Sequence, residues 1–248
     1  MKSVKTVLWF TKFGGSIAVI LPKIWKAGKL KATGDYKIYK PYVDKVVTKW
    51  MNSLVEFAGV NYIVEGKKNI PDDENVLFVA NHQGLFDFPA VVTCLKKPCA
   101  FIVKKEAASY PVVNHCMRLM DCIYIDRDNA REALKSLDAA AELIKNGRNV
   151  LIFPEGTRSK TGEIGAFKNG VYKIVEKAKC KVIPILIDGT RLAFEETGNI
   201  KPADVIVKVF PPIETKDMDR KQIKGLAGEI REMFIEELEK IKVKSEKA

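Results

Sequence analysis

The sequence is short of histidine and of paired cysteine, and both shortages narrow the chemistry it can support. Of 248 residues only two are histidine, His82 and His115. The five cysteines are an odd number with no C-x-x-C pair, so their spacing fits neither a zinc site nor a disulfide framework. No G-x-S-x-G elbow, Walker loop or dinucleotide fingerprint is present. We therefore expect no metal, no cofactor and no activated serine, and we expect the cysteines to be reduced core residues.

Arginine is missing from residues 1–60, which hold eleven lysines and three acids. This segment has a net charge of +8, out of +11 for the whole chain. Such a concentration of positive charge predicts an anionic partner, either nucleic acid or an anionic membrane surface. Tryptophan and phenylalanine lie among the lysines, while arginine is scarce. That combination favours a membrane surface over nucleic acid.

A long hydrophobic run is also lacking near the start. The longest uncharged stretch, Phe13–Pro22, has ten residues, and a spanning helix needs about 20. Helical spacing predicts one amphipathic helix ending near the Gly14-Gly15 pair and a second over residues 37–58, after a turn at Thr33–Asp35. We predict that residues 1–60 form a two-helix module that lies on a membrane. The alternative is that both helices simply pack on the rest of the protein.

From residue 61 onward, short apolar runs alternate with helical patterns. The whole chain is 47% hydrophobic and 29% charged, a globular composition. This alternation predicts an α/β domain over residues 61–248, with a mostly covered central sheet and flanking helices. The expected helices are 87–97, 106–120, 128–146 (with Asp128 as N-cap), 168–178 and 219–242. The expected strands are Tyr62–Val64, Val76–Ala80, Ala100–Val103, Ile123–Ile125, Val150–Phe153, Val182–Ile187 and Val205–Phe210.

His82 follows the predicted strand Val76–Ala80, and Asp87 lies five residues later. In α/β folds the carboxyl ends of strands usually hold the chemistry. A carboxylate that binds one imidazole nitrogen leaves the other as the basic one. The pattern alone is weak, because a lone histidine at a strand end is often structural. His115 lies in a helical pattern without such a partner, and we assign it no role.

Two more predicted strands end in arginine-containing strings. Phe153–Ser159 reads F-P-E-G-T-R-S, and Tyr124–Arg127 reads Y-I-D-R. The planar donors of arginine suit bidentate binding of a phosphate. If these strands are parallel, the histidine and both arginines meet at one edge of the sheet.

Four strings resemble, in order, the four motifs of the glycerolipid acyltransferase family: Asn81–Asp87 (N-H-x-x-x-x-D), Ile125–Arg127 (I-D-R), Phe153–Ser159 and Val182–Ile185 (V-I-P-I). The resemblance covers about residues 75–190, and its first and third motifs are specific. It implies acyl transfer from a thioester of acyl carrier protein or coenzyme A to the 2-hydroxyl of lysophosphatidate, giving phosphatidate at the cytoplasmic face of the cell membrane. It further implies a catalytic dyad, Pro184 beside the acyl chain, and a phosphate-binding set. The dyad is His82 and Asp87, and the binding set is Lys105, Arg127, Glu155, Gly156, Thr157 and Arg158.

The chain departs from the family pattern at two positions. Gly84 stands where many members have serine, and Asp121 stands where many have glycine. Two other functions stay open at this point. The first is the same reaction on another acceptor, such as glycerol 3-phosphate or a different lysolipid. The second is a non-enzymatic protein that binds membrane or nucleic acid through residues 1–60.

Overall fold

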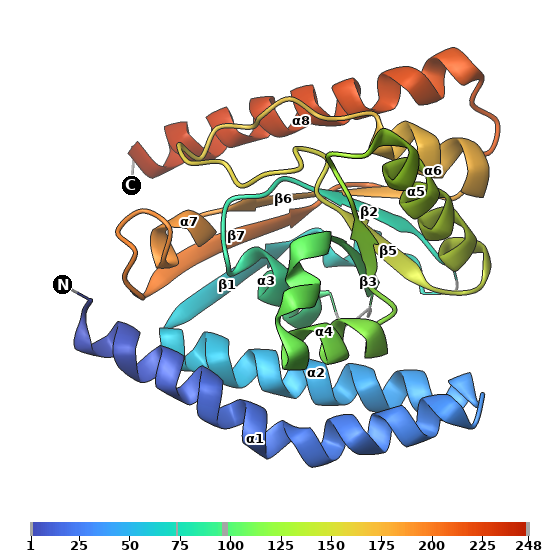
Figure 1. Ribbon diagram of the computed structural model, residues 1–248. Helices are drawn as coiled ribbons and strands as arrows, with labels where there is room; N and C mark the ends of the chain where they lie inside the picture. Colours follow the sequence, from blue (N-terminus) through green and yellow to red (C-terminus); the bar gives the residue numbers. More distant parts are fainter. Residues whose placement is uncertain (1, 73, 96–98, 247–248) are drawn as a thin grey trace.

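A computed structural model describes residues 2–72, 74–95 and 99–246. Its centre is a seven-stranded sheet in the order β1-β7-β6-β2-β5-β3-β4 (Figure 1). The five strands from β6 to β4 are parallel, whereas β7 is antiparallel to β6 and β1 is parallel to β7. All seven predicted strands are confirmed. They are β1 (Val60–Glu65), β2 (Leu77–Ala80), β3 (Cys99–Lys104), β4 (Ile123–Ile125), β5 (Asn149–Ile152), β6 (Val182–Asp188) and β7 (Ala203–Val209).

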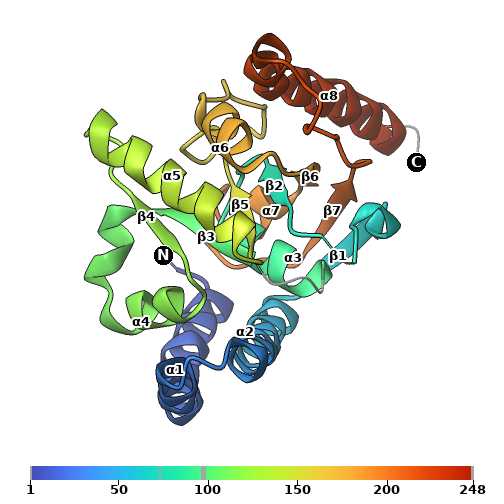
Figure 2. The same ribbon diagram turned by 90° about the vertical axis from the view of Figure 1, so that its right-hand side faces the viewer.

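Helices cover both faces of this sheet. On one face lie α1 (Val4–Ala32), α2 (Tyr36–Ala58), α3 (Asp87–Cys94) and α4 (Pro111–Leu119), and on the other lie α5 (Ala130–Lys145), α6 (Gly170–Ala178) and α8 (Arg220–Glu246) (Figure 2). Three short helices complete the described chain: η1 (Lys67–Asn69), η2 (Lys105–Ser109) and α7 (Thr190–Ala193).

Each face of the sheet has its own hydrophobic cluster because alternate strand residues point to opposite sides. In β2, Phe78 packs with α1–α4, whereas Leu77 and Val79 pack with α5, α6 and α8. All of β2 and β5 is buried, as expected for central parallel strands covered on both faces. The predicted α/β architecture with a covered sheet is therefore confirmed.

Three helix predictions need correction. The first helix does not end near Gly14-Gly15 but continues through this pair and Pro22 to Ala32. The range 106–120 divides into η2 and α4. The N-cap before α5 is Asn129 rather than Asp128, because the Asn129 side chain accepts hydrogen bonds from the backbone N–H groups of Arg131 and Glu132. In addition, α3 ends at Cys94, and the last two residues of the predicted range, 96 and 97, lie outside the described residues.

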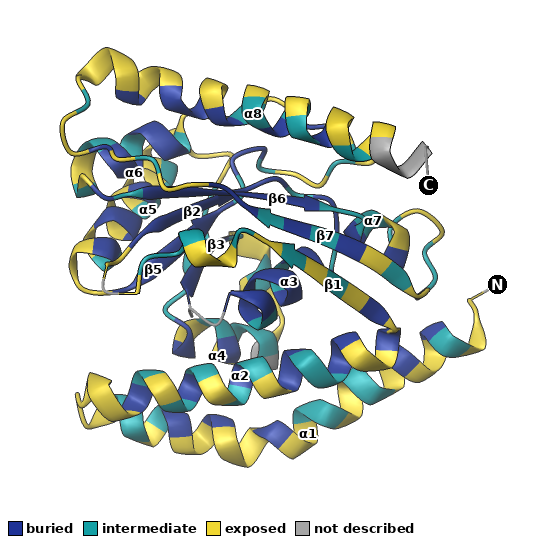
Figure 3. Ribbon diagram, turned by 180° about the vertical axis from the view of Figure 1, so that it is seen from behind, coloured by how far each residue is buried: buried dark blue, intermediate teal, exposed yellow. Residues whose placement is uncertain are grey.

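An aromatic group joins the two N-terminal helices. Trp9 and Trp50 lie on α1 and α2, and each stacks on Phe13, with ring centroids 5.7 Å apart in both pairs. The indole N–H of Trp9 donates to the carbonyl of Leu54 at 2.9 Å, and that of Trp50 donates to the Ser16 hydroxyl at 2.7 Å. The opposite side of α1 faces outward along most of its length (Figure 3).

Ion pairs connect α1 and α2 to the rest of the protein near the last turn of α1. The Asp121 carboxylate lies 2.9 Å from the Lys31 ammonium of α1 and 3.6 Å from the buried guanidinium of Arg148. Arg148 also lies 3.6 Å from Asp44 of α2. Burial raises the pKa of Asp44 to about 6, although the charge of Arg148 opposes the shift. Asp121 thus links α1 to the sheet through Arg148.

The conformation and contacts of Asp121 account for its departure from the family pattern, in which many members have glycine. Asp121 has φ +59°, in the left-handed region that favours glycine and is tolerated by aspartate. Glycine is the less strained residue at such a position. Here the carboxylate offsets the backbone strain by its ion pairs with Lys31 and Arg148.

Candidate active site

The loop between β2 and α3 is held against β6 by two amide side chains. The Asn81 amide donates to the carbonyl of Ile187 and accepts from its N–H, both at 2.8 Å. The Gln83 amide donates to the Asp188 carboxylate at 3.1 Å and accepts from the N–H of Gly189 at 3.0 Å. These paired contacts fix residues 81–83 on both sides of His82. The backbone therefore places His82 in one defined position at the carboxyl end of β2.

His82 and Asp87 form the predicted pair. The imidazole Nδ1 lies 2.6 Å from Oδ2 of Asp87, which is fully buried at the first turn of α3. The same oxygen accepts hydrogen bonds from the N–H groups of Gln83 and Gly84, and the Thr190 hydroxyl donates to the other oxygen. A carboxylate held in this way makes Nδ1 the protonated nitrogen. The unprotonated Nε2 is then the basic nitrogen of the ring.

Phe153 fixes the plane of the imidazole. It is the first residue after β5, and its ring stacks on that of His82 with centroids 4.3 Å apart and planes 20° apart. The segment that follows β5 returns to the same turn, because the N–H of Ser159 donates to the carbonyl of His82 at 2.7 Å. The side chain of His82 stays 21% exposed. The ring is therefore immobilised on one face while solvent or a ligand can still reach it.

Three carboxylates bind the backbone of the turn formed by residues 82–85, which we call the catalytic turn. Asp87 accepts the two central N–H groups, as described above. Glu155 accepts the N–H of His82 at 2.8 Å, and Glu195 accepts the N–H of Leu85 at 2.7 Å. All four N–H groups of the turn are thus engaged. An oxyanion that forms during a reaction must be stabilised by other donors.

Glu155 contacts the backbone of the catalytic turn with its carboxylate. One carboxylate oxygen binds His82 N–H, and the other accepts from the N–H of Gly165 at 3.1 Å. Burial raises the pKa of Glu155, and the two backbone hydrogen bonds oppose that shift. The carboxylate therefore braces the catalytic turn, and it does not line the cavity described below. A contact between Glu155 and a substrate stays a prediction.

Two arginines line the same cavity as His82. Arg127, Thr157 and Arg158 line this cavity together with the imidazole. Arg158 is half exposed, and its NH1 lies 3.2 Å from the Glu195 carboxylate. The Arg127 guanidinium donates to the carbonyl of Gly156. Two positively charged groups therefore stand beside the candidate base, as the parallel strands led us to expect.

Two further residues of the predicted binding set, besides Glu155, do not line the cavity. Lys105 pairs with Asp126 at 2.7 Å on the surface, and its neighbour Lys104 lines the cavity instead. Gly156 has φ +71°, which favours glycine, and thus serves the turn after β5. Pro184, expected beside the acyl chain, lies within the buried strand β6 and does not line the cavity. Direct substrate contacts of Lys105 and Gly156 stay predictions.

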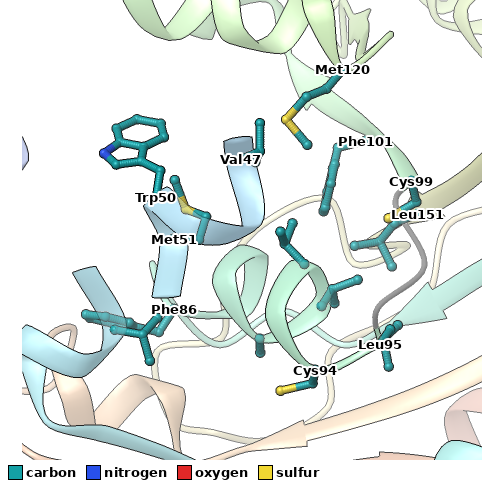
Figure 4. Close-up of a cluster of buried hydrophobic side chains, with 14 of the residues drawn as sticks. Val47, Trp50, Met51, Phe86, Cys94, Leu95, Cys99, Phe101, Met120 and Leu151 are labelled. Carbon is teal, nitrogen blue, oxygen red and sulfur yellow. The ribbon is translucent and has the colours of Figure 1, made fainter. Parts of the chain in front are cut away.

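The cavity has a volume of about 910 Å³ and is mostly apolar beyond the arginines. Helices α1 and α2 supply Trp9, Phe13, Trp50, Met51 and Leu54 to its wall. Phe101 of β3 and Met120 after α4 approach from the other side, around the buried helix α3 (Figure 4). A cavity of this size and lining is typical of a small-molecule or lipid site with a few oriented polar groups.

Several supporting residues carried no signal in the sequence. Thr190 and Glu195 belong to α7 and the loop after it, more than 100 residues from the catalytic turn. Phe153 lies in a motif string, but nothing in that string indicates that its ring stacks on His82, and the sequence does not show the contacts of the Asn81 and Gln83 amides with β6. Thr190 could have been found by examining polar residues that follow β6, because this strand lies next to β2.

Comparisons with known proteins identify the family of this chain. The acyltransferase family model matches residues 61–188. The chain is 32% identical over 187 residues to a 1-acyl-sn-glycerol-3-phosphate acyltransferase of Cocos nucifera, covering 75% of this chain and 60% of the relative. It is 28% identical over 187 residues to one of Borreliella burgdorferi, covering 75% of each. The chain thus spans less than two thirds of the plant protein.

A solved structure resembles nearly the whole chain. The crystal structure of the 1-acyl-sn-glycerophosphate (LPA) acyltransferase PlsC from Thermotoga maritima matches with a TM-score of 0.77 at 28% identity. The match covers 96% of this chain and 98% of the other. It therefore includes α1 and α2, outside the range of the family model. The protein belongs to the acyltransferase family.

Proposed function

We propose that this protein transfers a fatty acyl group from a thioester to the sn-2 hydroxyl of 1-acylglycerol 3-phosphate and so forms phosphatidic acid. The observation that carries this proposal is that His82, paired with Asp87, lines one cavity together with two arginines and a mostly apolar wall. The guanidinium groups suit a phosphate, and the apolar side chains suit acyl chains. The names of the relatives support this choice of acceptor.

The chemistry follows from the geometry of the pair. Nε2 of His82 takes the proton of the acceptor hydroxyl as its oxygen attacks the thioester carbonyl. The buried carboxylate of Asp87 stabilises the imidazolium that forms. When the tetrahedral intermediate collapses, the carbon–sulfur bond breaks and the thiolate takes the proton back from His82. A thioester is already activated, so the residues of this site need only move one proton and hold the acceptor.

The decisive experiment is incubation of the purified protein with lysophosphatidate and a labelled acyl thioester, followed by identification of the product. Labelled phosphatidate is the expected product, with the acyl group at the sn-2 position. Glycerol 3-phosphate and other lysolipids, tested in parallel, distinguish acceptors within the family. Acyl carrier protein and coenzyme A thioesters, tested separately, identify the donor. Transfer to none of these acceptors would contradict the proposal.

Replacement of Arg158 by alanine should raise the KM for the acceptor. Hydrogen bonds to charged groups contribute about 1.5–3 kcal/mol, which corresponds to about 10- to 150-fold in KM. The KM for the acyl thioester should change little, because the donor has no phosphate to place beside Arg158. Steady-state kinetics with each substrate varied in turn would measure both constants. Arg131→Ala, at an exposed position on α5, is the matched control. An effect confined to the donor would exclude this role.

We further propose that α1 attaches the protein to the anionic, cytoplasmic face of a membrane. α1 has 29 residues and is long and apolar enough to span a membrane by length and composition. Large apolar side chains lie exposed along it: Val4, Val7, Leu8, Phe10, Val19, Leu21 and Trp25. The ammonium of Lys29 lies over the Trp25 ring, 3.5 Å from its centroid. An exposed apolar face beside lysines suits the boundary between acyl chains and headgroups. Because the Trp9–Phe13–Trp50 group holds α1 on α2, peripheral or monotopic attachment fits better than a span.

Leu21→Glu should weaken flotation of the protein with anionic vesicles several-fold, because a charge would replace an apolar contact with the acyl region. Leu134→Glu is a close control, since Leu21 and Leu134 are both 46% exposed but Leu134 lies on α5. Co-flotation with liposomes containing phosphatidylglycerol would be measured for both variants and the parent. Equal loss in both variants, or pelleting with RNA and not with liposomes, would contradict attachment through α1.

A further inference from the structure

Glu195 joins the catalytic turn to the proposed anion-binding part of the cavity. It lies in the loop after α7, and its carboxylate lines the cavity. One oxygen, Oε1, accepts both the N–H of Leu85 at 2.7 Å and the NH1 of Arg158 at 3.2 Å. The same atom therefore bridges the backbone beside His82 and the guanidinium proposed to hold phosphate.

The second oxygen of Glu195 explains why residue 84 is glycine. A Cβ built on Gly84 would lie 2.5 Å from Oε2 of Glu195, closer than a Cβ approaches a neighbouring atom in real structures. Gly84 does not have a positive φ, so backbone conformation does not require glycine at this position. The conflict is steric, and a side chain at residue 84 would force the carboxylate to move. The carboxylate from the distant loop fills the space that the serine side chain of many family members would occupy.

The carboxylate depends on Arg158 for its charge balance. Oε2 is buried and has no hydrogen-bond partner among the described residues. Burial raises the pKa of Glu195, and the nearby charge of Asp87 adds to this shift, whereas the Leu85 hydrogen bond and the charge of Arg158 oppose it. Each residue therefore depends on the other. Arg158 stabilises the Glu195 carboxylate, and the carboxylate restricts the position of Arg158.

The loop that carries Glu195 is itself held by the first turns of α1. The N–H of Ile200 donates to the Thr6 hydroxyl at 2.8 Å, and the N–H of Ser3 donates to the Asn199 side chain at 2.7 Å. The ring of Phe194, the residue before Glu195, packs edge-on against Phe10 with centroids 5.8 Å apart. The loop that carries Glu195 is thus held in place by contacts with the start of α1.

We propose that Glu195 is a positioning residue that holds Arg158 against the catalytic turn and so sets where the acceptor phosphate lies relative to His82. This proposal rests on the proposed function, since it assigns a phosphate to Arg158. A guanidinium held by a carboxylate presents its remaining N–H groups in one direction. Without the brace, Arg158 is a half-exposed side chain with many rotamers, and the reacting hydroxyl is placed less well.

Glu195→Ala should raise the acceptor KM about tenfold and lower kcat severalfold, with the donor KM unchanged. Glu195→Gln keeps an oxygen that can accept from Leu85 and Arg158 and should recover most of both constants. If Glu195→Ala fails to fold, the Gln variant still tests the proposal through its smaller rise in acceptor KM. Unchanged acceptor KM in both variants, or a change in the donor KM alone, would overturn it.

A double-mutant cycle tests the contact with Gly84. Gly84→Ser introduces atoms where Oε2 lies, so it should displace the carboxylate and raise the acceptor KM as Glu195→Ala does. In the Glu195→Ala background the serine has room, and its added effect on the acceptor KM should be less than twofold. Equal effects of serine in the two backgrounds would refute the contact.

Direct binding separates this proposal from the proposed reaction. Glycerol 3-phosphate carries the phosphate shared by the candidate acceptors, and calorimetry measures its affinity without turnover. We expect Glu195→Ala and Arg158→Ala each to weaken binding, and the double variant to bind no more weakly than Arg158→Ala alone. Unchanged or tighter binding by Glu195→Ala would show that the carboxylate repels phosphate instead, and would overturn the brace. If the parent protein transferred no acyl group but Glu195→Ala still weakened binding, only the proposed reaction would fail.

Discussion

Replacing His82 with alanine should lower kcat by about 10² to 10⁴, the usual contribution of a general base. The hydroxyl of a lipid is a poor nucleophile unless its proton is accepted during attack. In this site the imidazole bound to Asp87 and stacked on Phe153 is the group placed to accept it. Initial rates at saturating lysophosphatidate and acyl thioester would measure the loss.

His115→Ala is the matched control for this experiment. The chain has only two histidines, and His115 lies exposed on α4. This variant should keep the activity of the parent. Thermal melting of both variants should stay close to that of the parent, because neither imidazole lies in the core. Near-normal activity of the His82 variant would exclude the proposed base.

Replacing Asp87 should reduce both activity and stability. Asp87→Asn keeps the size of the side chain but replaces one carboxylate oxygen by an NH2 group, which donates hydrogen bonds and cannot accept them. The imidazole would lose the partner that selects its tautomer, and kcat should fall by about 10² or more. Asp87→Ala removes the acceptor of four hydrogen bonds from a fully buried position. It should lower the free energy of unfolding by about 3–5 kcal/mol.

Urea unfolding and steady-state kinetics on the same samples would separate these two effects. Thr190→Val removes only the hydroxyl that donates to Asp87, so its loss of stability should be smaller, about 1–2 kcal/mol. Asp138→Asn changes an exposed carboxylate whose ion pair within the described residues is with the surface residue Lys177, and it should leave both measurements unchanged. An Asp87→Ala protein as stable as the Asp138 variant would contradict the role given to the buried carboxylate.

The sheet and the contact between His82 and Asp87 could be predicted because their signals are local. His82 and Asp87 lie on one loop, and each strand is a short apolar run with its own boundaries. The continuous first helix could not be predicted, because Gly14, Gly15 and Pro22 normally weaken or break a helix. A Cβ on either glycine would meet no neighbouring atom, and Pro22 is exposed, so these residues disturb no packing. Tertiary contacts of Trp9 and Phe13 with α2 compensate for their poor helix propensity.

The supporting groups of the site could not be predicted, because they depend on contacts between distant segments. The motif predicts that Glu155 lies near the site, but a sequence does not show whether a carboxylate faces a ligand or a backbone N–H. Thr190 reaches Asp87, and Glu195 reaches Leu85, because β6 pairs with β2. The sequence shows Gly84 as a departure from the family pattern, and its close contact with Glu195 appears only in the fold.

The anchoring of α1 at both ends has a mechanical consequence. Its first turns hold the loop of Glu195 through Thr6 and Ser3, and its last turn is fixed to Asp121 through Lys31. If the outer face of this helix lies in a lipid layer, as proposed, the helix cannot tilt or slide without pulling on both attachments. Changes in bilayer thickness or lateral pressure would then be transmitted as strain to the loop proposed to restrain Arg158, and the rate would depend on the physical state of the membrane.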